Sequence, residues 1–152
     1  MDTIKEKATE IKVINSTTGP DTNFTNDQIA TFLEKFLEQY GDPKEDILKC
    51  LDYVFDKNKG GFVILATQDD KIMGASIINE TGMSGYIPEN ILVYIAVHRD
   101  ARGLGIGKKL MKNIMEIANG SIALHVEENN PARFLYEKVG FESKYVEMRL
   151  TR

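Results

Sequence analysis

The chain contains one cysteine, Cys50, in 152 residues. A single thiol excludes an intrachain disulfide framework and a cysteine-rich metal cluster. Long apolar runs are lacking too: the longest covers residues 91–97, which is far too short to span a bilayer, and the N-terminal residues form no apolar signal segment. We therefore expect a cytoplasmic protein with no membrane segment and no metal centre.

Basic charge is not in excess. Lysine and arginine number 19 and aspartate and glutamate 23, so the formal net charge is −4 at pH 7. This balance does not favour nonspecific binding to nucleic acid, and we expect no nucleic-acid partner. Repeats, low-complexity tracts and long linkers are absent as well. The length and a hydrophobic content of 42% predict a single globular domain over residues 1–152.

The expected elements follow the order of a mixed α/β domain. The pattern predicts strands over residues 10–14, 62–67, 71–79, 91–97 and 121–126 and within 141–150, and helices over 26–40, 43–55, 106–118 and 131–139. Thr25 with Gln28 is expected to cap the first helix, and Asp42 the second. Residues 80–90 read as a loop.

A glycine-rich segment joins the strand over residues 91–97 to the next helix. A helix start leaves its first N–H groups without intrahelical partners and carries partial positive charge, and glycine lets an anion approach the backbone. The segment therefore predicts a phosphate-binding loop. Its residues are Arg102, Gly103, Leu104, Gly105, Ile106, Gly107 and Lys108.

A second block, over residues 129–141, reads Asn-Asn-Pro-Ala-Arg-Phe-Leu-Tyr-Glu-Lys-Val-Gly-Phe. The glycine-rich segment resembles the acyl-CoA-binding motif of the GNAT superfamily of N-acetyltransferases, and the second block resembles that family's other signature. Either motif alone is weak, but the two in this order and spacing are specific, and they cover about a third of the chain. The resemblance implies an α/β (α+β) GNAT fold: a mixed central sheet flanked by helices, with a splayed V between the two central parallel strands.

The resemblance also implies acetyl-CoA as co-substrate. Its pyrophosphate would lie against the N–H groups of residues 103–108, and its pantetheine arm would run along Ile95, Ala96 and Val97 like an additional strand. An N–H near Ala96 would polarise the thioester carbonyl. Asn129 or Asn130 would hydrogen-bond the pantetheine: the spacing of the signature favours Asn129, the Asn-Pro-Ala sequence favours Asn130, and both stay open.

In most of the family the acceptor amine attacks the thioester directly, in a ternary complex. Tyr136 stands at the position of the family's tyrosine, so we expect it to protonate or hydrogen-bond the leaving thiolate. Glu127 is our candidate for the base. Glu128, His125 and Tyr94 are alternatives, and none of the four stands at a diagnostic position.

We expect the acceptor, a small-molecule or peptide primary amine, to be delivered past the loop over residues 80–90, where Tyr86 and Glu89 would meet its ammonium form. Polyamines, aminoglycosides, amino-acid amines and protein N-termini or lysines all remain open. GNAT relatives are often dimers, so a homodimer is a further expectation.

Two other functions compete with catalysis of acetyl transfer. The first is a GNAT-like module that binds acyl-CoA as a sensor without turnover. The second is a Rossmann-like nucleotide-binding domain, but Lys108 occupies the place of its third glycine. About 45 residues follow Gly107, too few to finish a doubly wound sheet.

Overall fold

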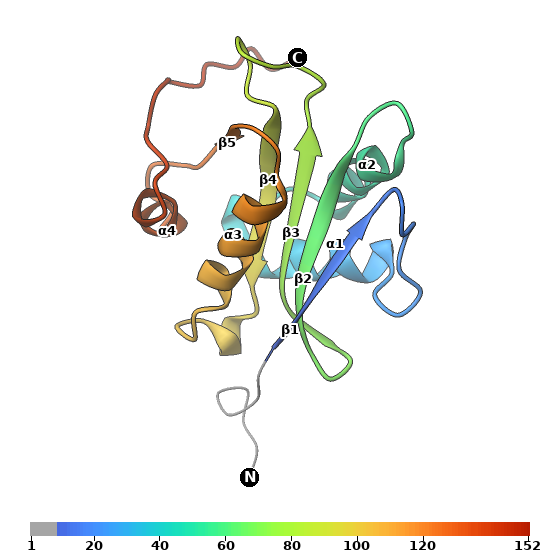
Figure 1. The fold of residues 1–152 in the computed structure, drawn as a ribbon. Coiled ribbons are helices and arrows are strands. Elements are labelled where there is room, and N and C mark those ends of the chain that lie inside the picture. Colours follow the sequence, from blue (N-terminus) through green and yellow to red (C-terminus); the bar gives the residue numbers. More distant parts are fainter. Residues whose placement is uncertain (1–8) are drawn as a thin grey trace.

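The structure is a computed structural model, and it describes residues 9–152. One sheet of five strands organises the fold, in the order β1-β2-β3-β4-β5 (Figure 1). The strands are β1 (Glu10–Asn15), β2 (Gly61–Gln68), β3 (Lys71–Glu80), β4 (Asn90–Val97) and β5 (Ile122–Leu124). Neighbours from β1 to β4 are antiparallel, and β4 and β5 are parallel. The sheet is therefore mixed, as expected.

Helices cover both faces of the sheet (Figure 1). Helices α1 (Asn26–Phe36) and α2 (Lys44–Phe55) pack on one face, α3 (Ile106–Ile117) packs on the other, and α4 (Ala132–Lys138) contributes to the core on the α3 side. Two short 3-10 helices, η1 (Glu38–Tyr40) and η2 (Arg99–Ala101), follow α1 and β4. Each face has its own apolar core. Fully buried members are Ile29, Leu33, Ile47, Leu51 and Val54 on the α1/α2 side, and Ile64, Ile78, Leu110, Met111 and Ile114 on the α3 side.

The start of α1 agrees with the sequence, but its end does not. Thr25 and Gln28 form the expected capping box, because the Gln28 N–H donates to the Thr25 hydroxyl and the Thr25 N–H donates to the Gln28 side chain. The predicted continuation to residue 40 is wrong. Glu38 has a φ of +56°, which no α-helix accommodates, so α1 ends at Phe36 and Tyr40 lies in η1.

A β-bulge in β4 changes which side chains face which core. Ile77 of β3 is opposite Tyr94, whereas the next residue, Ile78, is opposite Leu92, so Val93 is an extra residue in the strand. Leu92 therefore packs into the core on the α3 side, and Tyr94 packs on the α1/α2 side. Val93 is 36% exposed, as is Ile91, in a strand that reads as continuously apolar.

Strands β4 and β5 separate soon after they pair. Their register runs only from Asn90 opposite Ile122 to Leu92 opposite Leu124. Beyond Leu92, β4 continues to Val97 with β3 as its partner, and the edge that faced β5 is left open within the described residues. This separation between the two parallel strands is the splay that the resemblance implied.

The C-terminal segment differs from expectation. The sequence predicts a last strand within residues 141–150, but the structure gives residues 141–152 no helix or strand. The large apolar side chains there are 79–90% exposed: Tyr145, Val146, Met148 and Leu150. Apolar alternation predicts a strand only where an edge is there to pair with it, and β5, at three residues, offers a short one.

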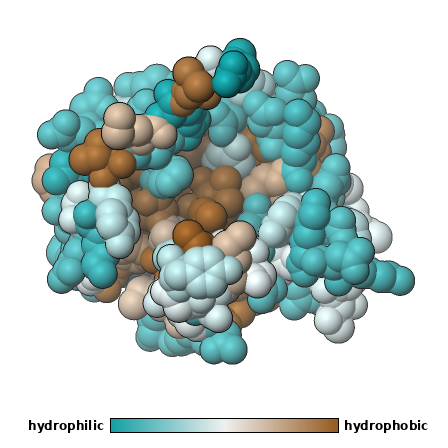
Figure 2. Space-filling model, turned by 90° about the horizontal axis from the view of Figure 1, so that it is seen from above, coloured by the Kyte–Doolittle hydropathy of each residue, from teal (hydrophilic) through white to brown (hydrophobic). Residues whose placement is uncertain are grey.

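Seen from above, hydrophobic residues are visible inside a hollow at the centre of the molecule, surrounded by hydrophilic residues (Figure 2).

In the described part of the chain, no helix is both long and apolar enough to cross a membrane. Ile117 of α3 is exposed, because the buried stripe of the helix ends one turn earlier, at Ile114.

Candidate active site

The glycine-rich loop has the backbone conformation that requires glycine. Gly103 has a φ of +82° and Gly105 a φ of +84°, a region that side-chain-bearing residues rarely adopt. A Cβ atom at either position would meet nothing within 4 Å. The two glycines are therefore explained by backbone conformation, and the space in front of them is open.

Helix α3 begins at this loop without a cap. Gly105 is its N-cap residue, no side chain of residues 9–152 bonds to its first N–H groups, and its first turn contains no acidic residue. The N–H groups of a first turn have no intrahelical acceptors, so they are available to an anion. Gly107 has a different role, because a Cβ there would lie 3.2 Å from a Leu135 methyl group of α4. Lys108, in the same turn, is exposed.

The Arg102 side chain is engaged by protein groups and not only available to a phosphate. Its guanidinium donates to the carbonyl oxygens of Val97 (3.3 Å) and Phe36 (3.0 Å), and it pairs with Glu38 at 3.2 Å. It thereby joins the end of β4 to the end of α1, where a cation also complements the helix dipole. The structure brings Arg102 to the loop through its backbone and holds its side chain against α1.

Ile95, Ala96 and Val97 lie in the part of β4 that β5 no longer accompanies. Ile95 and Val97 are half-buried against the core on the α3 side, and Ala96 is buried on the opposite face. The backbone groups that face the splay are not paired with β5. Such an edge can bind an extended ligand by main-chain hydrogen bonds, and it ends directly before η2 and the glycine-rich loop.

Tyr136 projects from α4 into the core on the α3 side and is 8% exposed. Its ring lies edge-on to Phe141, with centroids 6.0 Å apart. Burial raises the pKa of Tyr136 to about 12, so the phenol keeps its proton at neutral pH. No group within residues 9–152 forms a hydrogen bond with its hydroxyl. Tyr136 is thus a protonated donor without a partner in the described chain.

The two asparagines before α4 have different environments. The Asn130 side-chain oxygen accepts from the N–H of Ala132, the first residue of α4, at 2.9 Å, although Pro131 holds the N-cap position. Asn129 has an exposed side chain, and its backbone carbonyl accepts from the Tyr40 hydroxyl at 3.2 Å. The linker after α1 therefore contacts the segment between β5 and α4.

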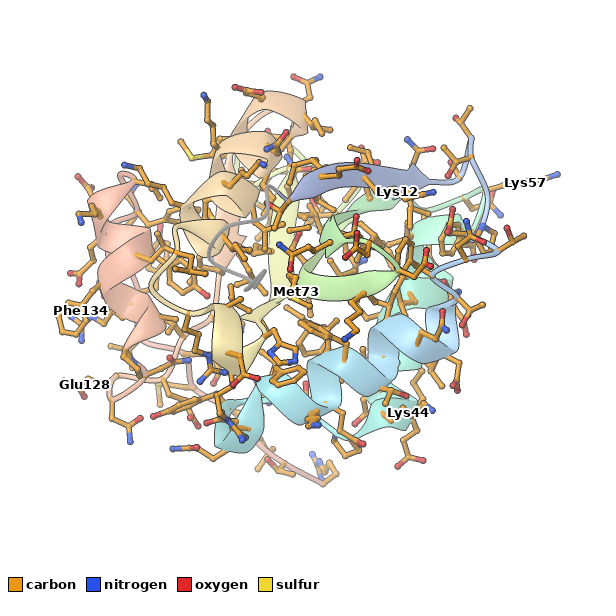
Figure 3. The ribbon with its side chains drawn as sticks, turned by 90° about the horizontal axis from the view of Figure 1, so that it is seen from below. Lys12, Lys44, Lys57, Met73, Glu128 and Phe134 are labelled. Atoms are coloured by element: carbon orange, nitrogen blue, oxygen red, sulfur yellow. The ribbon has the colours of Figure 1, made fainter. Side chains whose placement is uncertain are left out.

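The candidate bases after β5 lie on the surface. His125, Glu127 and Glu128 are exposed, and the Glu127 carbonyl accepts from the Asn130 N–H. Glu128 lies at the outer edge of the molecule, on the same side as Phe134 of α4 (Figure 3). The Glu127 and Glu128 carboxylates and the His125 ring are therefore in contact with solvent.

Tyr86 and Glu89 lie at the other end of β4 from the glycine-rich loop (Figure 1). The Glu89 carboxylate accepts from the Ser121 N–H (2.7 Å) and the Gly85 N–H (3.3 Å), and these bonds, led by the one from Ser121, lower the pKa of Glu89. It fastens the loop over residues 81–89 to the segment before β5. Tyr86 is 82% exposed. The structure does not bring these two residues together with the splay.

Asp42 is a residue whose role the sequence did not indicate. The prediction that it caps α2 is wrong, because Pro43 occupies the N-cap position and no side-chain cap bond is present. The Lys44 N–H instead bonds to Glu34. The Asp42 carboxylate accepts from the Tyr94 hydroxyl at 2.5 Å. Only the presence of Tyr94 in an aliphatic strand could have suggested a polar partner for that strand.

Comparison with known proteins agrees with this geometry. The sequence model of the acetyltransferase (GNAT) family matches residues 24–141. The chain is 35% identical over 83 residues to a 5-NmdU N-acetyltransferase of Pseudomonas phage PaMx11, a match that covers 53% of this chain and 57% of that enzyme. The chain thus spans little more than half the length of this curated relative.

Solved structures show the same fold at low identity. A possible acetyltransferase from Clostridium difficile 630 superposes with a TM-score of 0.66 at 20% identity, covering 96% of this chain and 98% of that one. An aminoglycoside N-acetyltransferase in complex with CoA gives a TM-score of 0.65 at 14% identity, covering 96% and 97%. The two motifs, the splayed sheet and the family match lead to one conclusion: the chain belongs to the acetyltransferase (GNAT) family.

Proposed function

We propose that the chain, acting as one domain, transfers the acetyl group of acetyl-CoA to a primary amine by direct attack in a ternary complex. One observation carries the proposal. The uncapped N-terminus of α3, with two glycines of positive φ before it, follows η2 at the end of the strand edge that the splay leaves open. The N-terminus of α3, which suits a phosphate, and the open edge of β4, which suits an extended chain, thus follow one another. A long ligand with a pyrophosphate at one end requires this arrangement.

In this proposal the backbone of residues 103–108 holds the pyrophosphate, with Lys108 adding positive charge. The edge formed by Ile95, Ala96 and Val97 holds the pantetheine arm. Asn129 and Asn130 lie across the splay from that edge, on the segment after β5. Since the Ala132 N–H already engages the Asn130 side-chain oxygen, the Asn130 amide NH2 group remains available as a donor.

The chemistry requires a proton donor for sulfur. The amine nitrogen forms a bond to the acetyl carbon, the carbon–sulfur bond breaks with its electron pair on sulfur, and Tyr136 donates a proton to the thiolate. The Tyr136 phenol is protonated at neutral pH, so its proton is available to the sulfur. Glu127 remains our candidate for the base that removes the amine's proton, and its exposure allows exchange of that proton with water.

For the acceptor, the phage relative is the guide. It is named for 5-NmdU, and we propose that compound as the first acceptor to test, with an aminoglycoside and a polyamine beside it. The net charge disfavours nonspecific binding to nucleic acid, which is a different property from acting on a modified nucleoside. Tyr86 and Glu89 can guide only an acceptor that extends to the far end of β4.

Two measurements test the proposal. Calorimetry should detect CoA binding, and free-thiol release from acetyl-CoA should appear with at least one amine. CoA binding without thiol release across a broad amine panel would favour the sensor function. Absence of CoA binding would contradict both functions.

We also propose that the chain forms a homodimer through residues 142–152, here called the C-terminal tail. The tail lies outside the family match, and its four large apolar side chains are exposed. The surface proposed to receive the tail is β5 of the second copy. Within the described sheet, β5 pairs along one edge only, and its Ile122 and Leu124 are half-buried. An apolar tail and an open edge complement each other between two copies.

A further inference from the structure

The linker between α1 and α2, residues 37–43, is fastened to both sides of the splay. On the β4 side, Arg102 pairs with Glu38, which has a φ of +56°. On the other side, the Tyr40 hydroxyl donates to the Asn129 carbonyl after β5. The linker therefore borders the splay on the face of the sheet that α1 and α2 cover.

Tyr94 connects this linker to the strand edge. It is the first residue after the bulge, at the point where β4 leaves β5, and its side chain is 8% exposed on the α1/α2 side. Its hydroxyl donates to Asp42 at 2.5 Å. Burial and, next, the Asp42 carboxylate raise the pKa of Tyr94 well above its usual range, so the phenol remains the donor and Asp42 the acceptor.

Asp42 keeps capacity for another partner. A carboxylate offers about four acceptor positions, and the bond from Tyr94 uses one of them. The nearest lysines along α2 are engaged elsewhere, because Lys44 pairs with Asp27 at 2.7 Å and Lys49 pairs with Asp46 at 3.4 Å. Within residues 9–152, Asp42 forms no ion pair, and it is exposed. A positioned carboxylate thus faces solvent beside the splay.

We propose that Asp42, positioned by Tyr94, binds the ammonium group of the acceptor on the α1/α2 side of the splay. The inference rests on the proposed function. On the opposite face, α3, α4 and the buried Tyr136 occupy the space beside the open edge. An acceptor that enters from the α1/α2 side meets Asp42 first, and after the base has removed a proton from its ammonium group, its nitrogen faces the strand edge that carries the thioester.

The test compares wild type with Asp42→Asn on charged and neutral nucleophiles. The charged acceptors are 5-NmdU, kanamycin and spermidine, and the neutral nucleophile is a hydrazide assayed at a pH where it is uncharged. We expect Asp42→Asn to raise KM for the charged acceptor about tenfold or more, as loss of a hydrogen bond to a charged group does. CoA affinity and the rate with the hydrazide should remain those of wild type.

The matched control is Asp46→Asn, which removes the same charge one turn further along but leaves the Tyr94 bond in place. It should leave KM unchanged. Tyr94→Phe removes only the positioning bond, so its KM should rise by less than that of Asp42→Asn. Raised salt should increase the KM of wild type and have little effect on that of Asp42→Asn.

The outcomes distinguish failure of the proposed function from failure of the ammonium site at Asp42. If wild type acetylates none of the amines, the proposed function fails, and this inference fails with it. If wild type is active and Asp42→Asn leaves KM for charged acceptors unchanged, only the inference fails. An equal loss with charged and neutral nucleophiles, or weakened CoA binding, would make Asp42 a structural residue and overturn its role as an ammonium site.

Discussion

At the scale of single residues, the site depends on a few polar groups whose surroundings differ. Tyr136 has no hydrogen-bond partner for its hydroxyl within residues 9–152, whereas Tyr94 and Asn130 each have one. A group without a partner is free to act on a ligand, and a group with one holds the structure or another side chain. These differences separate the effects of substitution on turnover from those on stability.

Tyr136→Phe should lower kcat by about 100-fold, because it removes the proton donor to sulfur. CoA affinity and the unfolding temperature should stay close to wild type, since the lost hydroxyl has no partner in the described chain to leave unpaired. Steady-state kinetics with calorimetry and thermal unfolding measure the three quantities. Tyr145→Phe, in the exposed tail, is the control. Unchanged kcat would remove Tyr136 from the mechanism.

Asn130→Ala should lower the free energy of unfolding by about 1 kcal/mol, because it removes the bond to the Ala132 N–H at the start of α4. Asn129→Ala should leave stability unchanged, since its side chain is exposed and its bond to Tyr40 uses the backbone carbonyl. Denaturant unfolding measures both. The CoA affinity of the two variants then shows which asparagine contacts pantetheine. Equal stability of the two variants would contradict a stabilising role for the bond between Asn130 and the Ala132 N–H.

At the scale of elements, the site depends on where α3 begins and how the loops around β4 are fastened. Two glycines of positive φ allow the chain to enter α3 without a cap, and the bulge at Val93 marks where β4 and β5 separate. At the far end of β4, the Glu89 carboxylate holds the loop over residues 81–89 through the Ser121 and Gly85 N–H groups. Backbone conformation therefore decides where α3 begins, and the charge of a side chain decides how the loop at the far end of β4 is held.

Gly105→Ala should cost about 1 kcal/mol of stability, because an L residue resists a φ of +84°. CoA affinity should fall about tenfold as well, since the added methyl group projects into the open space proposed for the pyrophosphate. Gly19→Ala is a matched control: its φ is +72°, its Cβ would also meet nothing within 4 Å, and it lies after β1. It should lose similar stability and no CoA affinity. Equal CoA binding by both variants would contradict the placement.

Glu89→Gln should destabilise the fold at neutral pH without changing the acceptor KM. The hydrogen bonds from Ser121 and Gly85 lower the pKa of Glu89 below its ordinary 4.5. Its contribution is therefore present above that value and is lost as pH falls through the lowered pKa. Thermal unfolding of wild type and variant should converge in acid. A raised acceptor KM would instead return the loop over residues 81–89 to the acceptor site.

At the scale of the whole molecule, the C-terminal tail is a segment that a single chain leaves uncovered. Its apolar side chains are almost fully exposed, and contiguous exposed apolar surface is typical of contacts between proteins. Removal of residues 142–152 should therefore convert a dimer into a monomer while thermal stability and CoA binding by the remaining domain persist. Light scattering measures the mass of both forms. A full-length chain that is monomeric at all concentrations would contradict the proposed dimer.

The sequence by itself determined the features that neighbouring residues decide. The capping box at Thr25, the hairpin between β2 and β3, and the glycines before α3 each depend on a few residues in succession, so backbone preference is enough to predict them. The same is true of the family, whose motifs are short and local. Tyr136 could be placed on α4 for this reason, although its burial could not be inferred.

Tertiary structure alone decided the rest. Asp42 meets Tyr94 across 52 residues, and Arg102 reaches Phe36 across 66, so neither contact could be read from neighbouring residues. Asp42 followed by Pro43 is typical of a helix start, and only the packing of α1 and α2 against β4 turned its carboxylate to the splay. The tail shows the same limit, because alternating apolar residues become a strand only beside an edge that accepts them.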